Sequence, residues 1–163
     1  MKVYGYCRIS TSKQSMERQI RNIKLAYPDA VIVKETYTGT KIQGRKEFEK
    51  LLKIVSTGDT LVFDSVSRMS RTAQEGYEMY QKLYNQGVSL VFLKEPHINT
   101  STYQQAMENQ LSVNVKTGDQ ASEELLSGIF GALNRYMLNL AKRQIQLAFE
   151  QAENCLLYTS PSP

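Results

Sequence analysis

The segment Tyr6–Ser12, YCRISTS, lies where a predicted buried strand gives way to a helix. The strand, Val3–Ile9, is mostly apolar, and Arg8 and Ser10 stand at its end. Because these two residues are two positions apart, their side chains lie on one face of an extended chain. A guanidinium beside a hydroxyl suits the binding of a phosphate group. The alternative is that both residues simply end the strand.

The same order of strand and helix repeats along the first part of the chain. The first helix begins with a capping box at Thr11 and Gln14 and runs to about Ala26, with Ile23 and Leu25 among its apolar positions. The alternation predicts an α/β fold, a mostly parallel four- to five-stranded sheet with helices on both faces. The predicted strands are Val3–Ile9, Ala30–Tyr37, Thr60–Asp64 and Gly87–Lys94, and further helices follow Arg45 and span Ala73–Gln86.

Arginines follow three of the four predicted strands. Arg8 and Ser10 end the first strand, Arg45 lies in the connection after the second, and Arg68 and Arg71 follow the third. In parallel sheets the ligand site lies beyond the carboxyl ends of the strands, so these side chains are expected at one edge. Guanidinium groups bind phosphate in a bidentate manner. The topology therefore predicts a phosphate site at this edge.

Several other kinds of site are disfavoured by the sequence. The only histidine, His97, lies far from Ser10, so a serine–histidine–aspartate hydrolase is not expected. Cys7 and Cys155 have no metal-ligand spacing, and no Walker-A or dinucleotide fingerprint is present, so neither metal nor cofactor is predicted. Cys7 is interpreted as a buried strand residue. No signal peptide or apolar run of bilayer length is found, so a cytoplasmic protein is expected.

The chain is basic, with a net charge of +4 and a pI near 9.0. Residues 1–25 hold six basic residues and one acidic residue, so the excess is concentrated there. Such a segment suits an anionic partner, and a solvated helix face is the alternative interpretation.

A long helix is predicted near the end of the chain, from about Ala121 to Ala152, after a polar connection with one short helix at Tyr103–Leu111. Its roughly 32 residues would extend about 48 Å. Apolar residues on several sides require more than one covering surface. We expect the chain's own domain to cover the part near Leu125–Leu133. A second subunit is then expected to cover Tyr136, Met137, Leu140, Ile145 and Phe149.

Three segments in order resemble the catalytic domain of the serine recombinases, the resolvase/invertase family: YCRISTSKQSMERQ, TGTKIQGRKEFEKLL and SVSRMSR. The resemblance implies that a serine attacks the DNA backbone, forms a 5′-phosphoserine link and frees a 3′-hydroxyl, without a metal. It implies as site residues the nucleophile Ser10, the phosphate-binding residues Arg8, Arg45, Arg68 and Arg71, and a polar residue, Gln19. Alternatively, Arg45 is an early-helix surface residue and Gln19 an exposed helix residue.

The resemblance also implies an organisation and a set of partners. Residues 1–118 would form the catalytic domain and residues 119–153 the long oligomerisation helix. Residues 154–163 end in YTSPSP and resemble vector-derived or disordered sequence. They suggest that the natural protein is truncated here and that a downstream domain is missing. The implied partners are double-stranded DNA and further copies of the chain, as a homodimer and as a tetramer in the synaptic complex. The implied location is cytoplasmic and nucleoid-associated.

The sequence departs from the family pattern at several positions. Ser67 stands where the family carries a carboxylate before the arginine, and Asp64 is the candidate to replace it. Glu35 stands for the usual aspartate near the end of the second strand, and Ala141-Lys142 replaces a Glu-Arg pair in the long helix. The sequence leaves two other functions open. One is a catalytically impaired recombinase-like module that assembles on DNA, and the other a phosphate-binding α/β signalling domain.

Overall fold

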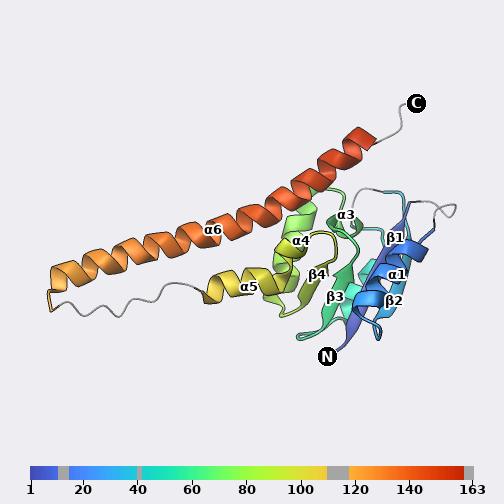
Figure 1. Ribbon diagram of the computed structural model, residues 1–163. Coiled ribbons are helices and arrows are strands. Elements are labelled where there is room, and N and C mark those ends of the chain that lie inside the picture. Colours follow the sequence, from blue (N-terminus) through green and yellow to red (C-terminus); the bar gives the residue numbers. More distant parts are fainter. Residues whose placement is uncertain (11–14, 40–41, 110–117, 160–163) are drawn as a thin grey trace.

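The computed structural model describes residues 1–10, 15–39, 42–109 and 118–159. Its centre is a sheet of four parallel strands in the order β2-β1-β3-β4 (Figure 1). The sheet confirms the predicted α/β class. The strands are β1 (Val3–Ile9), β2 (Val31–Thr36), β3 (Thr60–Phe63) and β4 (Ser89–Phe92).

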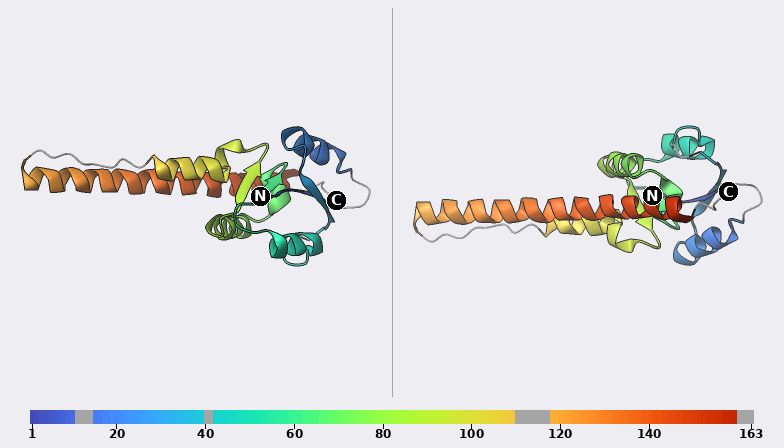
Figure 2. Two further views of the ribbon diagram at one scale, coloured as in Figure 1. Left: turned by 90° about the horizontal axis from the view of Figure 1, so that it is seen from below. Right: turned by 90° about the horizontal axis from the view of Figure 1, so that it is seen from above.

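Helices cover both faces of the sheet, as predicted. Helix α1 (Glu17–Ala26) lies on one face, and α2 (Lys46–Ile54) and α4 (Ala73–Asn85) lie on the other (Figure 2). The capping box expected at the start of the first helix falls at residues 11–14, outside the described residues. A separate apolar core lies between the sheet and the helices on each side.

The core beneath α1 is small and closely packed. Cys7, Ile23 and Val62 are completely buried there, which confirms the interpretation of Cys7. Burial raises the pKa of the Cys7 thiol to about 11, so the thiol is not ionised at neutral pH. Gly5 allows the close approach of α1, because a Cβ at this position would lie 2.7 Å from Ile23 Cγ2. Leu25, expected as an apolar contact, is instead 77% exposed because it points away from the sheet.

The segment after β3 contains a one-turn helix, α3 (Val66–Met69), whose two terminal residues are buried. Their apolar side chains reach the main core, so the backbone between them is drawn tightly against the ends of the strands. The α3 backbone therefore lies beside the buried arginines Arg8 and Arg45.

Two side chains bind the backbone amides at the outer edge of β4. Asn99 Oδ1 accepts the Phe92 amide at 2.7 Å, and Thr100 Oγ1 accepts the Leu90 amide at 2.9 Å. These residues link the 3-10 turn η1 (Pro96–Ile98) to α5 (Thr100–Glu108). Helix α5 therefore begins three residues before the predicted start, and the end predicted for it falls outside the described residues.

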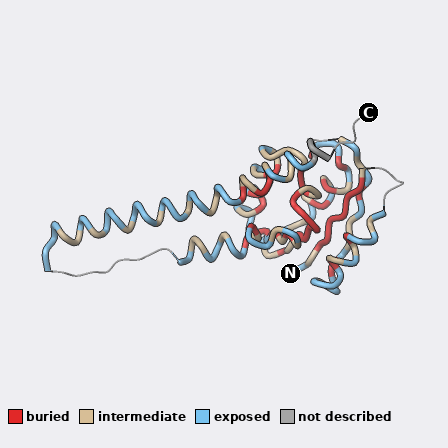
Figure 3. The backbone as a smooth tube through the Cα atoms, turned by 45° about the horizontal axis from the view of Figure 1, so that its top comes forward, coloured by how far each residue is buried: buried red, intermediate tan, exposed pale blue. Residues whose placement is uncertain are grey.

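The long helix α6 (Gln120–Thr159) packs on the domain through its C-terminal half and projects beyond it with the other half (Figures 1 and 3). The expectation that residues near Leu125–Leu133 pack on their own domain is wrong. Instead Ile145 is 3% exposed and Phe149 is 1% exposed. The reason is Gly76 on α4, which leaves room for the Phe149 ring where any Cβ would clash with it.

The projecting half carries six exposed apolar residues, which we call the α6 stripe: Leu125, Ile129, Leu133, Tyr136, Met137 and Leu140. Helix α6 continues through Thr159, so it includes part of the segment 154–163 that was expected to lie outside the fold. Among the described residues, no helix is long and apolar enough to cross a membrane.

Candidate active site

Two arginines are buried at the carboxyl edge of the sheet and bind the backbone of α3. Arg8 Nη2 donates to the Ser67 carbonyl at 2.8 Å, and Arg45 Nη1 donates to the Met69 carbonyl at 2.5 Å. Arg8 is 1% exposed and Arg45 is 0% exposed, so the interpretation of Arg45 as a surface residue is wrong. Both guanidinium groups also lie 3.4 Å from the Arg68 carbonyl. The α3 backbone therefore joins the arginines of three connections.

Arg68 and Arg71 complete the arginine cluster around the Ser10 hydroxyl group. Arg68 Nη1 donates to the Arg8 carbonyl at 3.1 Å, and Arg71 Nη1 donates to the Thr38 carbonyl at 3.2 Å. Arg71 Nη2 donates to Ser10 Oγ. Ser10 and Arg71 are only partly buried, so their contact is open to a ligand from outside.

The positive charge of this cluster is not neutralised by direct ion pairs. Within the described ranges, no carboxylate lies within salt-bridge distance of Arg8, Arg45, Arg68 or Arg71. Burial, followed by the charges of Arg45 and Arg71, lowers the pKa of Arg8 to about 9, so this guanidinium stays protonated at neutral pH. Buried nitrogens on Arg45, Arg68 and Arg71 have no hydrogen-bond partner among the residues that the structure describes. Uncompensated donors and charge of this kind favour binding of an oxyanion.

Nearby carboxylates bind the backbone or other side chains instead. Glu35 accepts the amides of Glu47 and Phe48, at 3.2 and 3.1 Å, and therefore caps the start of α2. Asp64 accepts Asn22 Nδ2 at 2.9 Å and pairs with Lys94 at 3.4 Å.

Asp64 therefore acts on Arg68 at a distance. Its charge opposes the lowering of the Arg68 pKa that burial causes. The hydroxyl of Ser67, at the position of the expected carboxylate, lies 2.8 Å from that of Ser65. The described residues contain no cluster of three His, Cys, Asp or Glu side chains that could hold a metal ion.

Gln19 is buried and holds the backbone of Arg8. Its Oε1 accepts the Arg8 amide at 3.0 Å, and its Nε2 donates to the Arg8 carbonyl at 2.9 Å. The pairing of β1 with β3 ends at Tyr6 and Phe63, so Arg8 has no strand partner on that side. The Gln19 amide replaces that partner. The interpretation as an exposed helix residue is therefore wrong, and Gln19 is a positioning residue.

Tyr37 is a further site residue that the sequence did not indicate. Its carbonyl lies 3.4 Å from Arg8 Nη1, and Arg45 Cζ lies 5.9 Å from its ring centroid. The aromatic residue directly after β2 is the only sequence signal for this role, and it is not specific.

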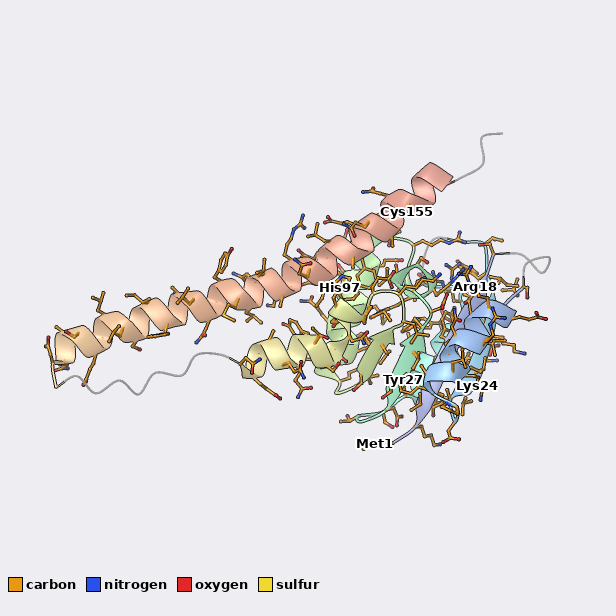
Figure 4. The ribbon with its side chains drawn as sticks, viewed as in Figure 1. Met1, Arg18, Lys24, Tyr27, His97 and Cys155 are labelled. Atoms are coloured by element: carbon orange, nitrogen blue, oxygen red, sulfur yellow. The ribbon has the colours of Figure 1, made fainter. Side chains whose placement is uncertain are left out.

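The basic residues near the start of the chain divide between several roles. Arg8 belongs to the site, and Lys24 binds the carbonyls of Pro28 and Ala30 beyond the end of its own helix. Arg18 and Arg21 are exposed on α1. Arg18 lies on the far side of the molecule from the projecting half of α6 (Figure 4). Only part of this charge is therefore available to a partner at the surface.

Comparison with known proteins places this geometry in a family. The model of the family described as Resolvase, N terminal domain, matches residues 3–154. The chain belongs to this family. The three segments that hold Ser10 and the four arginines all lie within the matched residues.

Among curated relatives, a resolvase of Clostridium perfringens is 30% identical over 98 residues, which are 60% of this chain and 51% of that protein. The Transposon Tn21 resolvase of Escherichia coli is 32% identical over 107 residues, 64% of this chain and 53% of that protein. The chain thus spans about half the length of these relatives. A crystal structure of a resolvase family site-specific recombinase from Streptococcus pneumoniae aligns over 99% of both chains, with 22% identity and a TM-score of 0.49.

Proposed function

We propose that this resolvase-family chain is the catalytic domain of a site-specific DNA recombinase and that Ser10 is its nucleophile. The observation that carries the proposal is the contact of Arg71 with Ser10 Oγ, inside a cluster of arginines that form no salt bridge with any described carboxylate. A DNA phosphate placed there would lie against a hydroxyl and several guanidinium groups at once. These groups match the charge and geometry of a phosphodiester.

In the proposed reaction, Ser10 Oγ attacks the phosphorus while its proton passes to water. The new bond joins Oγ to phosphorus, and the bond between phosphorus and the 3′ oxygen breaks. The 3′ oxygen takes up a proton and leaves as a hydroxyl, and a 5′-phosphoserine link remains. Guanidinium groups already in place stabilise the charge that develops on the phosphoryl oxygens. Attack by a 3′-hydroxyl from another strand reverses the chemistry and rejoins the DNA.

The proposed partners are double-stranded DNA and further copies of this chain. The α6 stripe supports association, because a contiguous row of exposed apolar residues marks an interface more often than a solvated surface. A symmetric dimer covers the same stripe on both copies. Cutting and exchanging two duplexes then requires two dimers, which form a tetramer. The proposed location is on chromosomal DNA in the cytoplasm.

A second candidate function is a DNA-assembly module that binds without cutting. The observation in its favour is Ser67, whose hydroxyl pairs with Ser65 where the family carries a carboxylate. This function would leave the arginine cluster in use for binding phosphate and would form no covalent link.

Trapping of a covalent protein–DNA adduct distinguishes the two functions. The chain is fused at its C-terminal end to a sequence-specific DNA-binding module, so that a duplex with two matching sites becomes the substrate. Denaturing electrophoresis should show an adduct on the 5′ end of the cut strand with the unchanged chain. Ser10→Ala should abolish it and leave DNA affinity unchanged. An adduct that persists in Ser10→Ala contradicts the assignment of the nucleophile, and no adduct with either protein favours the assembly module.

A further inference from the structure

The helices that flank three of the arginines are all capped from elsewhere in the chain. None of α2, α3 and α4 has a side-chain cap of its own. Glu35 caps α2 after Arg45, as described above. Glu95, beyond the end of β4, accepts the Val66 amide at 3.1 Å at the start of α3, and Glu153 accepts the Ala73 amide at 3.0 Å at the start of α4.

In this arrangement the carboxylates can position the arginines through the backbone without neutralising their positive charge. The amides at a helix start lack partners within the helix, and the positive end of the helix dipole favours a carboxylate there. A carboxylate that binds these amides fixes the helix, whereas one paired directly with a guanidinium would compete with phosphate. Within the described residues, the three glutamates hold the backbone and none forms a salt bridge with an arginine of the site.

Glu153 differs from the other two because it belongs to α6, 80 positions along the chain from its partner. Helix α6 packs closely on α4 beside Glu153, because the Phe149 ring, one turn earlier on α6, fills the space over Gly76. Helix α6 is also the helix that carries the exposed stripe. One carboxylate therefore connects the proposed association helix to the start of α4.

Only one residue, Thr72, lies between Ala73 and Arg71, the arginine that touches Ser10. Thr72 precedes Ala73, and its amide and carbonyl both bind Ser70 Oγ, at 3.2 and 2.8 Å. Arg71 lies inside this small closed turn, and its Nη2 donates to Ser10 Oγ. A shift of the first residue of α4 would therefore be passed on to the backbone of Arg71, because this turn is held by hydrogen bonds at both ends.

We propose that Glu153 positions Arg71 on Ser10 by binding the Ala73 amide. The packing of α6 on α4 then determines where the Arg71 guanidinium lies relative to Ser10 Oγ. The inference rests on the proposed function, because it assigns Glu153 a role in the same cleavage step. It makes Glu153 a positioning residue, since its carboxylate binds backbone and not substrate.

The experiment compares Glu153→Ala and Glu153→Gln with Glu150→Ala as the matched control. Glu150 lies one turn earlier on α6 and pairs with Arg143 at 3.1 Å, without a hydrogen bond to α4. Two readouts are taken on the DNA-binding fusion: the single-turnover rate of adduct formation at saturating DNA, and DNA affinity. The NMR signal of the Arg71 Nε–H group, on the chain without DNA, reports the arginine independently of cleavage.

We expect Glu153→Ala to slow adduct formation about tenfold, since it removes a hydrogen bond to a charged acceptor, and to leave DNA affinity unchanged. Glu153→Gln keeps an acceptor oxygen and should restore most of the rate. The Arg71 signal should move in Glu153→Ala, move less in Glu153→Gln, and stay in place in Glu150→Ala.

Equal rates and unmoved signals in Glu153→Ala and its control would overturn the inference, whatever the nucleophile. If Glu153→Ala does not fold, Glu153→Gln decides, since an Arg71 signal identical to that of the unchanged chain contradicts the inference. Failure of the proposed function looks different: Ser10→Ala would still form adduct, or no protein would, while the Arg71 signal would still report the role of Glu153.

Discussion

At the scale of single residues, the amide of Gln19 shows how a site can depend on a side chain that never reaches the ligand. Gln19→Ala removes both partners that the Gln19 amide provides for the Arg8 backbone and leaves the buried Arg8 amide without one. We expect a loss of about 2 kcal/mol in the free energy of unfolding, the usual cost of an unsatisfied buried donor. Urea denaturation measures this loss. The control, Gln104→Ala, removes an exposed amide paired with Glu108 on α5 and should change stability little.

The same scale gives a prediction about metal ions. Four guanidinium groups, from Arg8, Arg45, Arg68 and Arg71, supply the positive charge that divalent ions supply in many phosphoryl-transfer sites. Adduct formation on preassembled complexes should therefore stay within about twofold of its rate in excess EDTA. A complete loss that added Mg²⁺ reverses would contradict the arginine-based chemistry.

At the scale of elements, the contact of α6 with α4 depends on the absence of a side chain at Gly76. A Cβ there would lie inside the van der Waals contact distance of the Phe149 ring. Gly76→Ala should therefore destabilise the fold by about 1–3 kcal/mol through overpacking, although alanine favours helix more than glycine does. Gly131→Ala on α6 is the matched control, because its Cβ meets no atom within 4 Å. Thermal unfolding should show a lower melting temperature for the first variant and no loss for the second.

At the scale of the whole molecule, the α6 stripe leads to a prediction about association. Met137 and Leu140 are 39% and 48% exposed in the single chain, so replacing both with glutamate should not disturb the domain. Burying these side chains in a dimer is worth several kcal/mol, so their replacement should weaken dimerisation by more than about 100-fold. Light scattering across a micromolar concentration series measures the shift to monomer. The control, Leu25→Glu at an exposed position of α1, should leave the measured mass unchanged. An unmutated chain that stays monomeric throughout the series would contradict the predicted dimer.

Much of the architecture follows from sequence pattern, because neighbouring residues decide it. Apolar strands alternate with amphipathic helices, and this local alternation is enough to predict a parallel sheet. The carboxyl ends of parallel strands meet at one edge, so the order of elements alone brings Arg8, Arg45, Arg68 and Arg71 together. The structure confirms that these arginines and Ser10 are close, and the role of each in catalysis stays a prediction.

The tertiary structure decided the features that depend on contacts between distant segments. The role of Gln19 follows from the early end of the β1–β3 pairing, and the seat of α6 from the space at Gly76. The caps supplied by Glu95 and Glu153 join segments 29 and 80 positions apart. A sequence pattern records which side chains a segment carries, whereas these contacts depend on which backbone groups remain unpaired after the sheet has formed. That information exists only in the folded chain.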